Sequence, residues 1–188
     1  MMNMTMNPTR VITGRAVFSY LTVNEPRVPQ GGGRPKYSVS LIIPKSDTAT
    51  VDRIRDAIRA AYAEGQAKLM KDYGSVPPLE ELKTPLRDGD LERPEIEEYQ
   101  NSWFLNAASV TQPGIVDADR RPIVDPSELY SGIVGRASIN FYAYNVRGNR
   151  GIACGLNNLQ KLADGKPLGH HTRPEDDFAE VQDDSEPW

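Results

Sequence analysis

The residues best suited to chemistry lie along one extended segment, residues 132–146, in which small apolar and polar side chains alternate. One face of such a strand is apolar, as expected of a core face. The opposite face carries Arg136, Asn140, Tyr142 and Tyr144. Tyrosine rings can stack on unpaired bases, and a neighbouring guanidinium can bind phosphate. The pattern therefore favours a surface that binds single-stranded nucleic acid.

A structural interpretation of the same tyrosines stays open, because aromatic residues are common on half-buried strands. Tyr142 and Tyr144 would then cover a second small core beneath the Pro-rich segment 74–98. Each further candidate could also be an ordinary solvated cation or core tryptophan, but their occurrence together with the aromatic strand favours binding. These candidates are Arg15, Arg34, Lys36, Trp103, Arg147 and Arg150.

Patterns typical of catalysis are weak. The run Gly31–Lys36 lacks the Gly-Lys-Ser/Thr ending of a phosphate-binding loop and precedes a strand. Asp88, Asp90 and Glu92 could hold a divalent metal, but the same residues form an ordinary turn. Cys154 is the single cysteine, which excludes an internal disulfide and a cysteine-rich zinc site. We expect no cofactor and no metal.

The elements that must position the binding residues are mostly strands. Alternation predicts strands at 10–23, 36–43, 102–110, 132–146 and 150–156, with a bend at Gly14 in the first. Ser46-Asp47-Thr48 can cap a helix that continues to about Lys71, and residues 156–162 are expected to form a final helical turn. Segment 74–98 is expected to be an exposed excursion. Five strands with an inserted helix are compatible with a small Greek-key barrel or with a sandwich.

The charge is distributed unevenly between the body and the C-terminal residues. The chain has 22 Lys and Arg and 26 Asp and Glu, and seven of the acids but none of the bases lie in residues 175–188. The body therefore carries 22 basic and 19 acidic residues, which suits a nucleic-acid binder with an acidic interaction tail. A disordered tail that only aids solubility is the simpler alternative.

Acids and isolated aromatic residues share this tail. We expect its last residues to mimic the DNA backbone in a basic groove or to anchor a partner protein. The residues expected to do so are Asp183, Asp184, Glu186 and Trp188.

The 188 residues suit one domain. We predict a flexible N-terminus at 1–9, one binding domain at 10–169 and a disordered acidic tail at 170–188. The sequence shows neither an apolar run long enough to span a bilayer nor a signal peptide, so we expect a cytosolic protein that does not bind membranes.

Four motifs resemble a family of phage single-stranded DNA-binding proteins that was first catalogued as a domain of unknown function. They are KYSVSLIIPK from Lys36, PLRDGD from Pro85, YSG from Tyr130 and IACGLNNLQK from Ile152. The resemblance covers about residues 10–169. It implies a mainly β, five-stranded OB-fold barrel that coats single strands during DNA replication and recombination in the cytoplasm of the infected bacterium. The tail is also similar to tails that recruit phage or host replication proteins.

The leading hypothesis is therefore a non-enzymatic, sequence-tolerant binder of single-stranded DNA. Two other classes of protein remain as alternatives: a metal-dependent phage nuclease that uses the acids near Asp88, and a virion or adaptor protein whose exposed aromatic residues bind another protein. The sequence also leaves a homodimer open.

Overall fold

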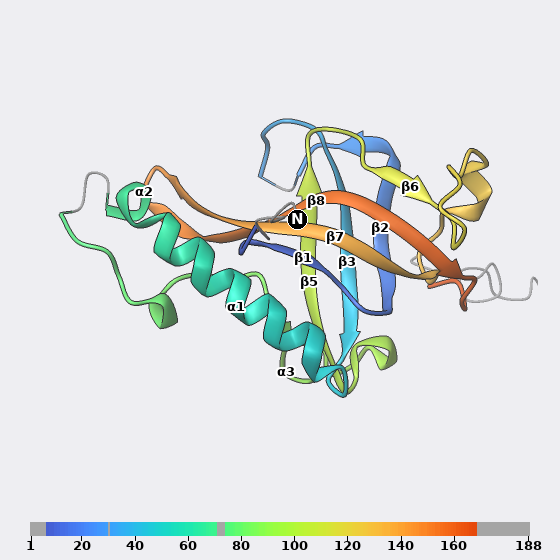
Figure 1. The fold of residues 1–188 in the computed structure, drawn as a ribbon, viewed down its shortest axis with the longest axis horizontal. Helices are drawn as coiled ribbons and strands as arrows, with labels where there is room; N and C mark the ends of the chain where they lie inside the picture. Colours follow the sequence, from blue (N-terminus) through green and yellow to red (C-terminus); the bar gives the residue numbers. More distant parts are fainter. Residues whose placement is uncertain (1–6, 30, 71–73, 169–188) are drawn as a thin grey trace, which may run out of the picture.

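The computed structural model describes residues 7–29, 31–70 and 74–168, and its five long strands close into a barrel (Figure 1). These strands are β2 (Ala16–Arg27), β3 (Lys36–Pro44), β5 (Ser102–Ser109), β7 (Val134–Val146) and β8 (Asn149–Ala163). Around the ring the order is β2, β3, β5, β8, β7 and back to β2. All neighbours are antiparallel except β5 and β8. This connectivity is that of an OB-fold. The predicted barrel is therefore confirmed, and the alternative β-sandwich fold is not what the chain adopts.

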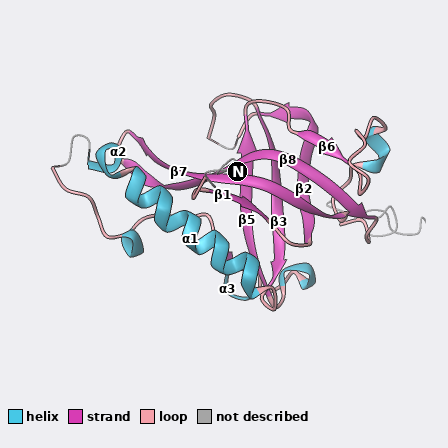
Figure 2. Ribbon diagram, viewed as in Figure 1, coloured by secondary structure: helices cyan, strands magenta, loops and turns pink. Residues whose placement is uncertain are grey.

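Shorter elements extend the barrel or cover it (Figure 2). The short strands are β1 (Arg10–Ile12) beside β7, β4 (Arg87–Asp88) beside β5, and β6 (Gly114–Val116) beside β8. The helices are α1 (Thr48–Glu64), α2 (Gln66–Met70) and α3 (Gly89–Glu92), and the single 3-10 turns are η1 (Leu79–Glu81), η2 (Glu97–Tyr99) and η3 (Pro126–Glu128). None of the helices in the described residues is long and apolar enough to cross a membrane.

The core lies inside the barrel and under α1. Alternating side chains of β3 and β7 point inward as predicted, and Leu41, Ile43, Ile139 and Phe141 are almost completely buried. Helix α1 packs its apolar stripe against β7, β1 and β8. The buried residues of this stripe are Val51, Ile54, Ala57, Ile58 and Ala61.

The predicted helix from residue 48 to about Lys71 is interrupted at Gly65. The Gly65 N–H still donates to the Ala61 carbonyl, but its Cα lies so close to Ala143 of β7 that a Cβ would collide with that side chain. Glycine therefore allows α1 to end tightly against the sheet, and α2 continues as a separate short helix.

The predicted first strand is two strands. The chain leaves strand geometry at Thr13–Arg15, between β1 and β2, where a Cβ on Gly14 would meet the Asp47 carboxylate. A second irregularity lies in β2, where Tyr20 has a φ of 48° and the register with β3 shifts between Ser19 and Thr22. The expected distortion is thus present, but part of it lies six residues beyond Gly14.

The helical turn expected at 156–162 is wrong, because β8 continues to Ala163. Leu156 pairs with Ile139 and Leu159 with Ala137, with one extra residue of β8 inserted between these pairs. This bulge lets two leucines three residues apart both point into the core, which produced a helix-like spacing in a strand.

Segment 74–98, expected to be an exposed excursion, packs against the barrel at several points. Val76, Leu79, Leu82 and Leu86 contact the core cluster. The Lys83 carbonyl also accepts a hydrogen bond of 2.9 Å from the Ile152 N–H of β8. These apolar residues hold the segment against the barrel. They lie between prolines and do not recur at helix or strand spacing, so the sequence pattern did not reveal their burial.

The N-cap of α1 provides a test of this fold. The Asp47 carboxylate accepts hydrogen bonds from the Thr50 N–H at 3.1 Å and the Thr50 hydroxyl at 2.7 Å. We expect Asp47→Ala to lower the free energy of unfolding by about 1 kcal/mol, as is typical for loss of an N-cap. Urea denaturation measures this change, with the exposed α1 residue Asp52 changed to Ala as the control. Equal effects of the two substitutions would contradict the capping role.

Candidate nucleic-acid interface

Strands β3 and β5 present small side chains on the face that points away from the core. Val39 of β3 is buried in the core, so its neighbours Ser38 and Ser40 point to the opposite face. In the β3–β5 register Ser38 pairs with Ala108, and Ser40 pairs with Asn106. This outer face is therefore shallow and mildly polar.

The outer face is hollowed at two places. The first hollow, about 300 Å³, is lined by Tyr20, Ser38, Val39, Ser40, Arg93, Tyr99 and Asn106. The second, about 270 Å³, is lined by Lys36, Ala108, Ser109, Val110, Asn140, Tyr142, Gly155, Leu156 and Asn157. The pairing of Ser38 with Ala108, and of Ala108 with Gly155, joins the two hollows across neighbouring strands. We call the surface formed by these residues the binding groove.

Two tyrosine rings lie at the ends of the binding groove. Tyr20 is 45% exposed and Tyr142 is 44% exposed, so each ring keeps part of its surface open to a ligand. Burial raises the pKa of the Tyr142 hydroxyl above its ordinary value. Half-exposed aromatic rings suit stacking on bases.

The backbone at Tyr20 explains why this ring reaches the groove. Simple alternation along β2 would place Tyr20 on the same face as Phe18, which is buried in the core. The positive φ of Tyr20 interrupts the alternation and directs the ring to the outer face. A non-glycine residue in this region costs about 1–3 kcal/mol, and such strain is concentrated at functional sites.

Arg93 carries an unusual polar group into the first hollow. Its Nε atom is buried and has no hydrogen-bond partner within the described part of the chain. Its guanidinium lies 5.8 Å from the centre of the Phe104 ring. An unpaired buried N–H costs about 1–3 kcal/mol of stability. The guanidinium carries further N–H donors, and Arg93 lines the hollow. Phosphate oxygens accept hydrogen bonds from such donors.

Two connections correspond to the loops that bind oligonucleotides in other OB-folds. The β2–β3 loop contains Arg34 and three glycines, Gly31 to Gly33, each with a φ near 100°. The β7–β8 hairpin turns at Arg147-Gly148, where both residues have positive φ as in a type I′ turn. In OB-folds the outer face of the second and third strands and the loops equivalent to these two bind oligonucleotides.

The structure brings together only some of the residues selected from the sequence. Lys36, Asn140 and Tyr142 line the groove. Arg34 lies in the β2–β3 loop, and Arg147 lies in the turn of the β7–β8 hairpin.

The other five selected residues lie elsewhere. The Arg136 guanidinium donates two hydrogen bonds to Gln160 Oε1. Arg150 donates to the Leu69 and Ser75 carbonyls, which ties the hairpin to α2 and the following segment.

Tyr144 lies over Gly151, where its hydroxyl would be 2.8 Å from an added Cβ. Arg15 lies between β1 and β2, next to Gly14, whose N–H donates to Thr50 at the start of α1. Neither residue lines the groove.

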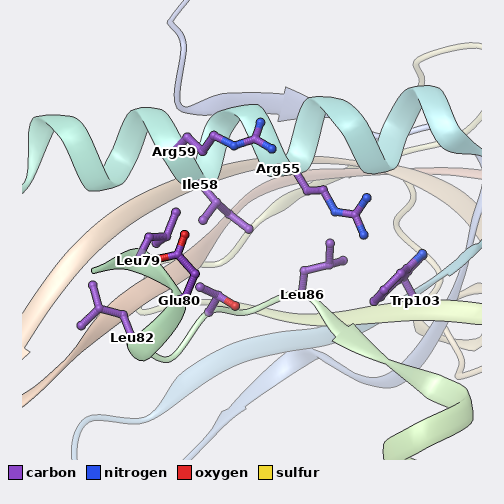
Figure 3. Close-up of a pocket in the computed structure, with 9 residues that line it drawn as sticks. Arg55, Ile58, Arg59, Leu79, Glu80, Leu82, Leu86 and Trp103 are labelled. Carbon is purple, nitrogen blue, oxygen red and sulfur yellow. The ribbon is translucent and has the colours of Figure 1, made fainter. Parts of the chain in front are cut away.

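Trp103 lies on the opposite side of β5 from the groove. It packs against the core cluster, and the cationic groups of Lys45 and Arg55 lie 5.1 and 5.0 Å from its ring centre. The close-up in Figure 3 shows Trp103 facing a separate hollow under α1. Because its neighbour Phe104 points to the outer face, alternation excludes Trp103 from the groove.

The acids considered as a metal site are paired with cations instead. Lys45 Nζ lies 2.8 Å from Asp88 and 2.7 Å from Asp90, and the hydrogen bonds from Lys45 lower the pKa of both carboxyl groups. Glu92 accepts two hydrogen bonds from Arg87. Among the residues that the structure describes, no cluster of His, Cys, Asp or Glu could hold a metal ion.

Comparison with known proteins identifies the family. The family model described as "Enterobacter phage Enc34, ssDNA-binding protein" matches residues 9–187. The chain belongs to this family. It is also 30% identical over 148 residues to putative protein p50 of Acyrthosiphon pisum secondary endosymbiont phage 1, covering 75% of this chain and 76% of that protein. The resemblance noted in the sequence is thus confirmed.

Solved structures confirm the fold. The single-stranded DNA-binding protein of bacteriophage Enc34 in a C-terminally truncated form has a TM-score of 0.71 and 22% identity, over 86% of this chain and 90% of that one. The same protein in complex with single-stranded DNA has a TM-score of 0.68 and 21% identity, over 87% and 91%. The single-stranded DNA-binding protein gp2.5 of bacteriophage T7 has a TM-score of 0.61 and 15% identity, over 87% and 97%.

Arg93 allows a direct test of the groove. We expect Arg93→Met to weaken binding of single-stranded DNA by about 10- to 100-fold, because a charged hydrogen bond contributes about 1.5–3 kcal/mol. The free energy of unfolding should stay the same or rise, since the unpaired N–H is removed. Fluorescence anisotropy and urea denaturation measure the two quantities. Arg136→Met is the matched control, and a larger loss of affinity there would place the DNA on the other part of β7.

Proposed function

We propose that this protein binds single-stranded DNA in the binding groove, without catalysis and without sequence preference, and protects it during phage DNA replication and recombination. The observation that carries this proposal is that the half-exposed rings of Tyr20 and Tyr142 and the Arg93 guanidinium share the groove on the outer face of an OB-fold barrel. Membership of a single-stranded DNA-binding family supports it independently. The site of action would be the infected bacterial cell.

Each part of the groove has a role in this proposal. Bases stack on Tyr20 and Tyr142, which tolerates any sequence because every base has a π-face. Phosphates contact Arg93 and Lys36 in the groove, and further phosphates of the strand contact Arg34 of the β2–β3 loop and Arg147 of the β7–β8 hairpin. The serines and alanine of the floor leave space for a backbone to approach the sheet.

The tail would regulate access to the groove or recruit replication proteins. Residues 170–188, including Asp183, Asp184, Glu186 and Trp188, lie outside the described residues. The last described residue, Leu168, packs on the cluster of Ile42, Tyr99 and Phe104, and Tyr99 also lines the first hollow of the groove. The last described residue thus lies near the groove, and we propose that the seven acids that follow in the sequence compete with phosphates for it.

The test of the proposed function is binding of a labelled single-stranded oligonucleotide, followed by fluorescence anisotropy. Affinity should fall steeply with salt, because each neutralised phosphate releases counterions. We expect Tyr142→Ala to lower affinity by about 5- to 150-fold, equivalent to one base stack of about 1–3 kcal/mol, whereas Tyr142→Phe retains most of it. Absence of salt-dependent binding by the unmodified chain would overturn the proposal and favour the protein-adaptor alternative.

Truncation after Pro174 tests the regulatory role of the tail. We expect the truncated chain to bind DNA several-fold more tightly at low salt, with a smaller gain at moderate salt, because the competition is electrostatic. A full-length chain in which Asp183, Asp184 and Glu186 become the matching amides is the control for chain length, and it should show part of the gain. Unchanged affinity in both variants would leave recruitment as the role of the tail.

A further inference from the structure

A hollow of about 340 Å³ lies between α1 and the segment that contains η1 and β4 (Figure 3). It is separated from the binding groove by β5, because Trp103 faces this hollow whereas Asn106 and Ala108 face the groove. We call it the α1 pocket. Its lining residues are Arg55, Ile58, Arg59, Leu79, Glu80, Leu82, Thr84, Leu86 and Trp103.

The floor of the α1 pocket is apolar. Ile58 is 5% exposed, and Leu79, Leu82, Leu86 and Trp103 are partly buried against the same core cluster. In Figure 3 these side chains converge below the helix from three different segments. A floor of this kind accepts a large apolar or aromatic side chain.

The upper rim of the pocket is cationic. Within the described part of the chain, Arg55 has no acidic partner, and its guanidinium lies over the Trp103 ring at 5.0 Å. Arg59 forms an exposed pair with Asp56 at 2.6 Å, which a second carboxylate can share at small cost. Glu80 is the one acid among the lining residues. An aromatic residue flanked by carboxylates matches this combination of cations and apolar floor.

The chain itself contains such a segment. Residues 183–188 read Asp-Asp-Ser-Glu-Pro-Trp, so three acids lie within five residues of Trp188. The carboxylates match Arg55 and Arg59, and the indole matches the leucine-lined floor. At most about 3.5 Å per residue, the stretch from Leu168 to Trp188 can extend for several tens of ångströms. That reach is enough to contact an adjacent molecule.

We propose that the α1 pocket receives residues 183–188 of a neighbouring copy when both copies lie on one DNA strand, an inference that rests on the proposed function. The tail leaves the body on the groove side of β5, at Leu168, whereas the pocket opens on the other side. DNA phosphates in the groove repel the tail of the same copy. The released tail then reaches the next copy and links the two, so binding to long strands is cooperative.

Peptide binding tests the pocket directly. The protein is the full chain carrying Trp188→Ala, so that its own tail does not compete, with the groove filled by a short unlabelled oligonucleotide. A fluorescent peptide of residues 175–188 should bind, and should bind at least about tenfold more weakly when Arg55 and Arg59 are both changed to Ala. Lys68→Ala, which removes an exposed cation from α2, is the matched control. No binding, or equal binding to the double variant, would overturn the proposal.

Measurements of cooperative DNA binding show whether the docked tail comes from a neighbouring copy or from the same copy. In the full chain, Arg55→Ala with Arg59→Ala should leave affinity for a single-site oligonucleotide unchanged but reduce cooperative binding to a long strand several-fold. Unchanged cooperativity would overturn docking between copies even if the peptide binds. If the unmodified chain does not bind the single-site oligonucleotide at all, the proposed function itself is rejected. Failure of the docking proposal and failure of the proposed function are therefore distinguishable.

Discussion

Barrel closure between β5 and β8 depends on a narrow parallel contact at Ala108 and Gly155. The side chain of Asn140 lies over Gly155, so even a Cβ at this position would meet the Asn140 carbonyl oxygen at 2.7 Å. A glycine is thus required at position 155 for the Asn140 amide to lie across β8. Ala108 and Gly155, which close the barrel, also line the binding groove. Closure of the barrel and the shape of its ligand surface are therefore one constraint.

The groove also concentrates features that a purely structural surface would avoid. Tyr20 adopts a backbone conformation that non-glycine residues rarely take, and Arg93 buries its Nε–H without an acceptor among the described residues. Both cost stability, and the surrounding barrel core maintains them. Their common location in one hollow, beside small residues that leave room for a ligand, is what favours a binding role over the simple covering of a second core.

Strand β5 divides the molecule into two chemically different surfaces. On its outer side, half-exposed tyrosines and the cationic side chains of Lys36 and Arg93 suit a flexible polyanion with stacked bases. On its inner side, Trp103 lies between Lys45 and Arg55 at the edge of an apolar pocket that suits a short acidic aromatic segment. Because side chains alternate along a strand, one segment supports both surfaces without conflict. The acids near Asp88 serve this arrangement structurally, since they hold Lys45 in place.

Much of the fold could be predicted from local patterns, because alternation and capping depend on neighbours in the chain. The inward face of β7, the extent of β3 and the Asp47 cap were all predicted in this way. Irregularities were harder to predict, since bulges depend on the partner strand. The bulge in β8 made Leu156 and Leu159 look helical, and the distortion at Tyr20 reversed the face of its ring.

The sequence by itself determined the class of the molecule: a β-rich body with a basic excess, a cap helix, an acidic tail and a strand that combines rings with cations. Only the tertiary structure decided which of these residues share a surface. It placed Arg136 on Gln160, Arg150 on backbone carbonyls and Trp103 behind β5, and it brought Arg93 from an irregular segment to the groove. The physical reason is that residue type follows local composition, whereas a binding site depends on strand register and barrel closure, which join residues far apart in the chain.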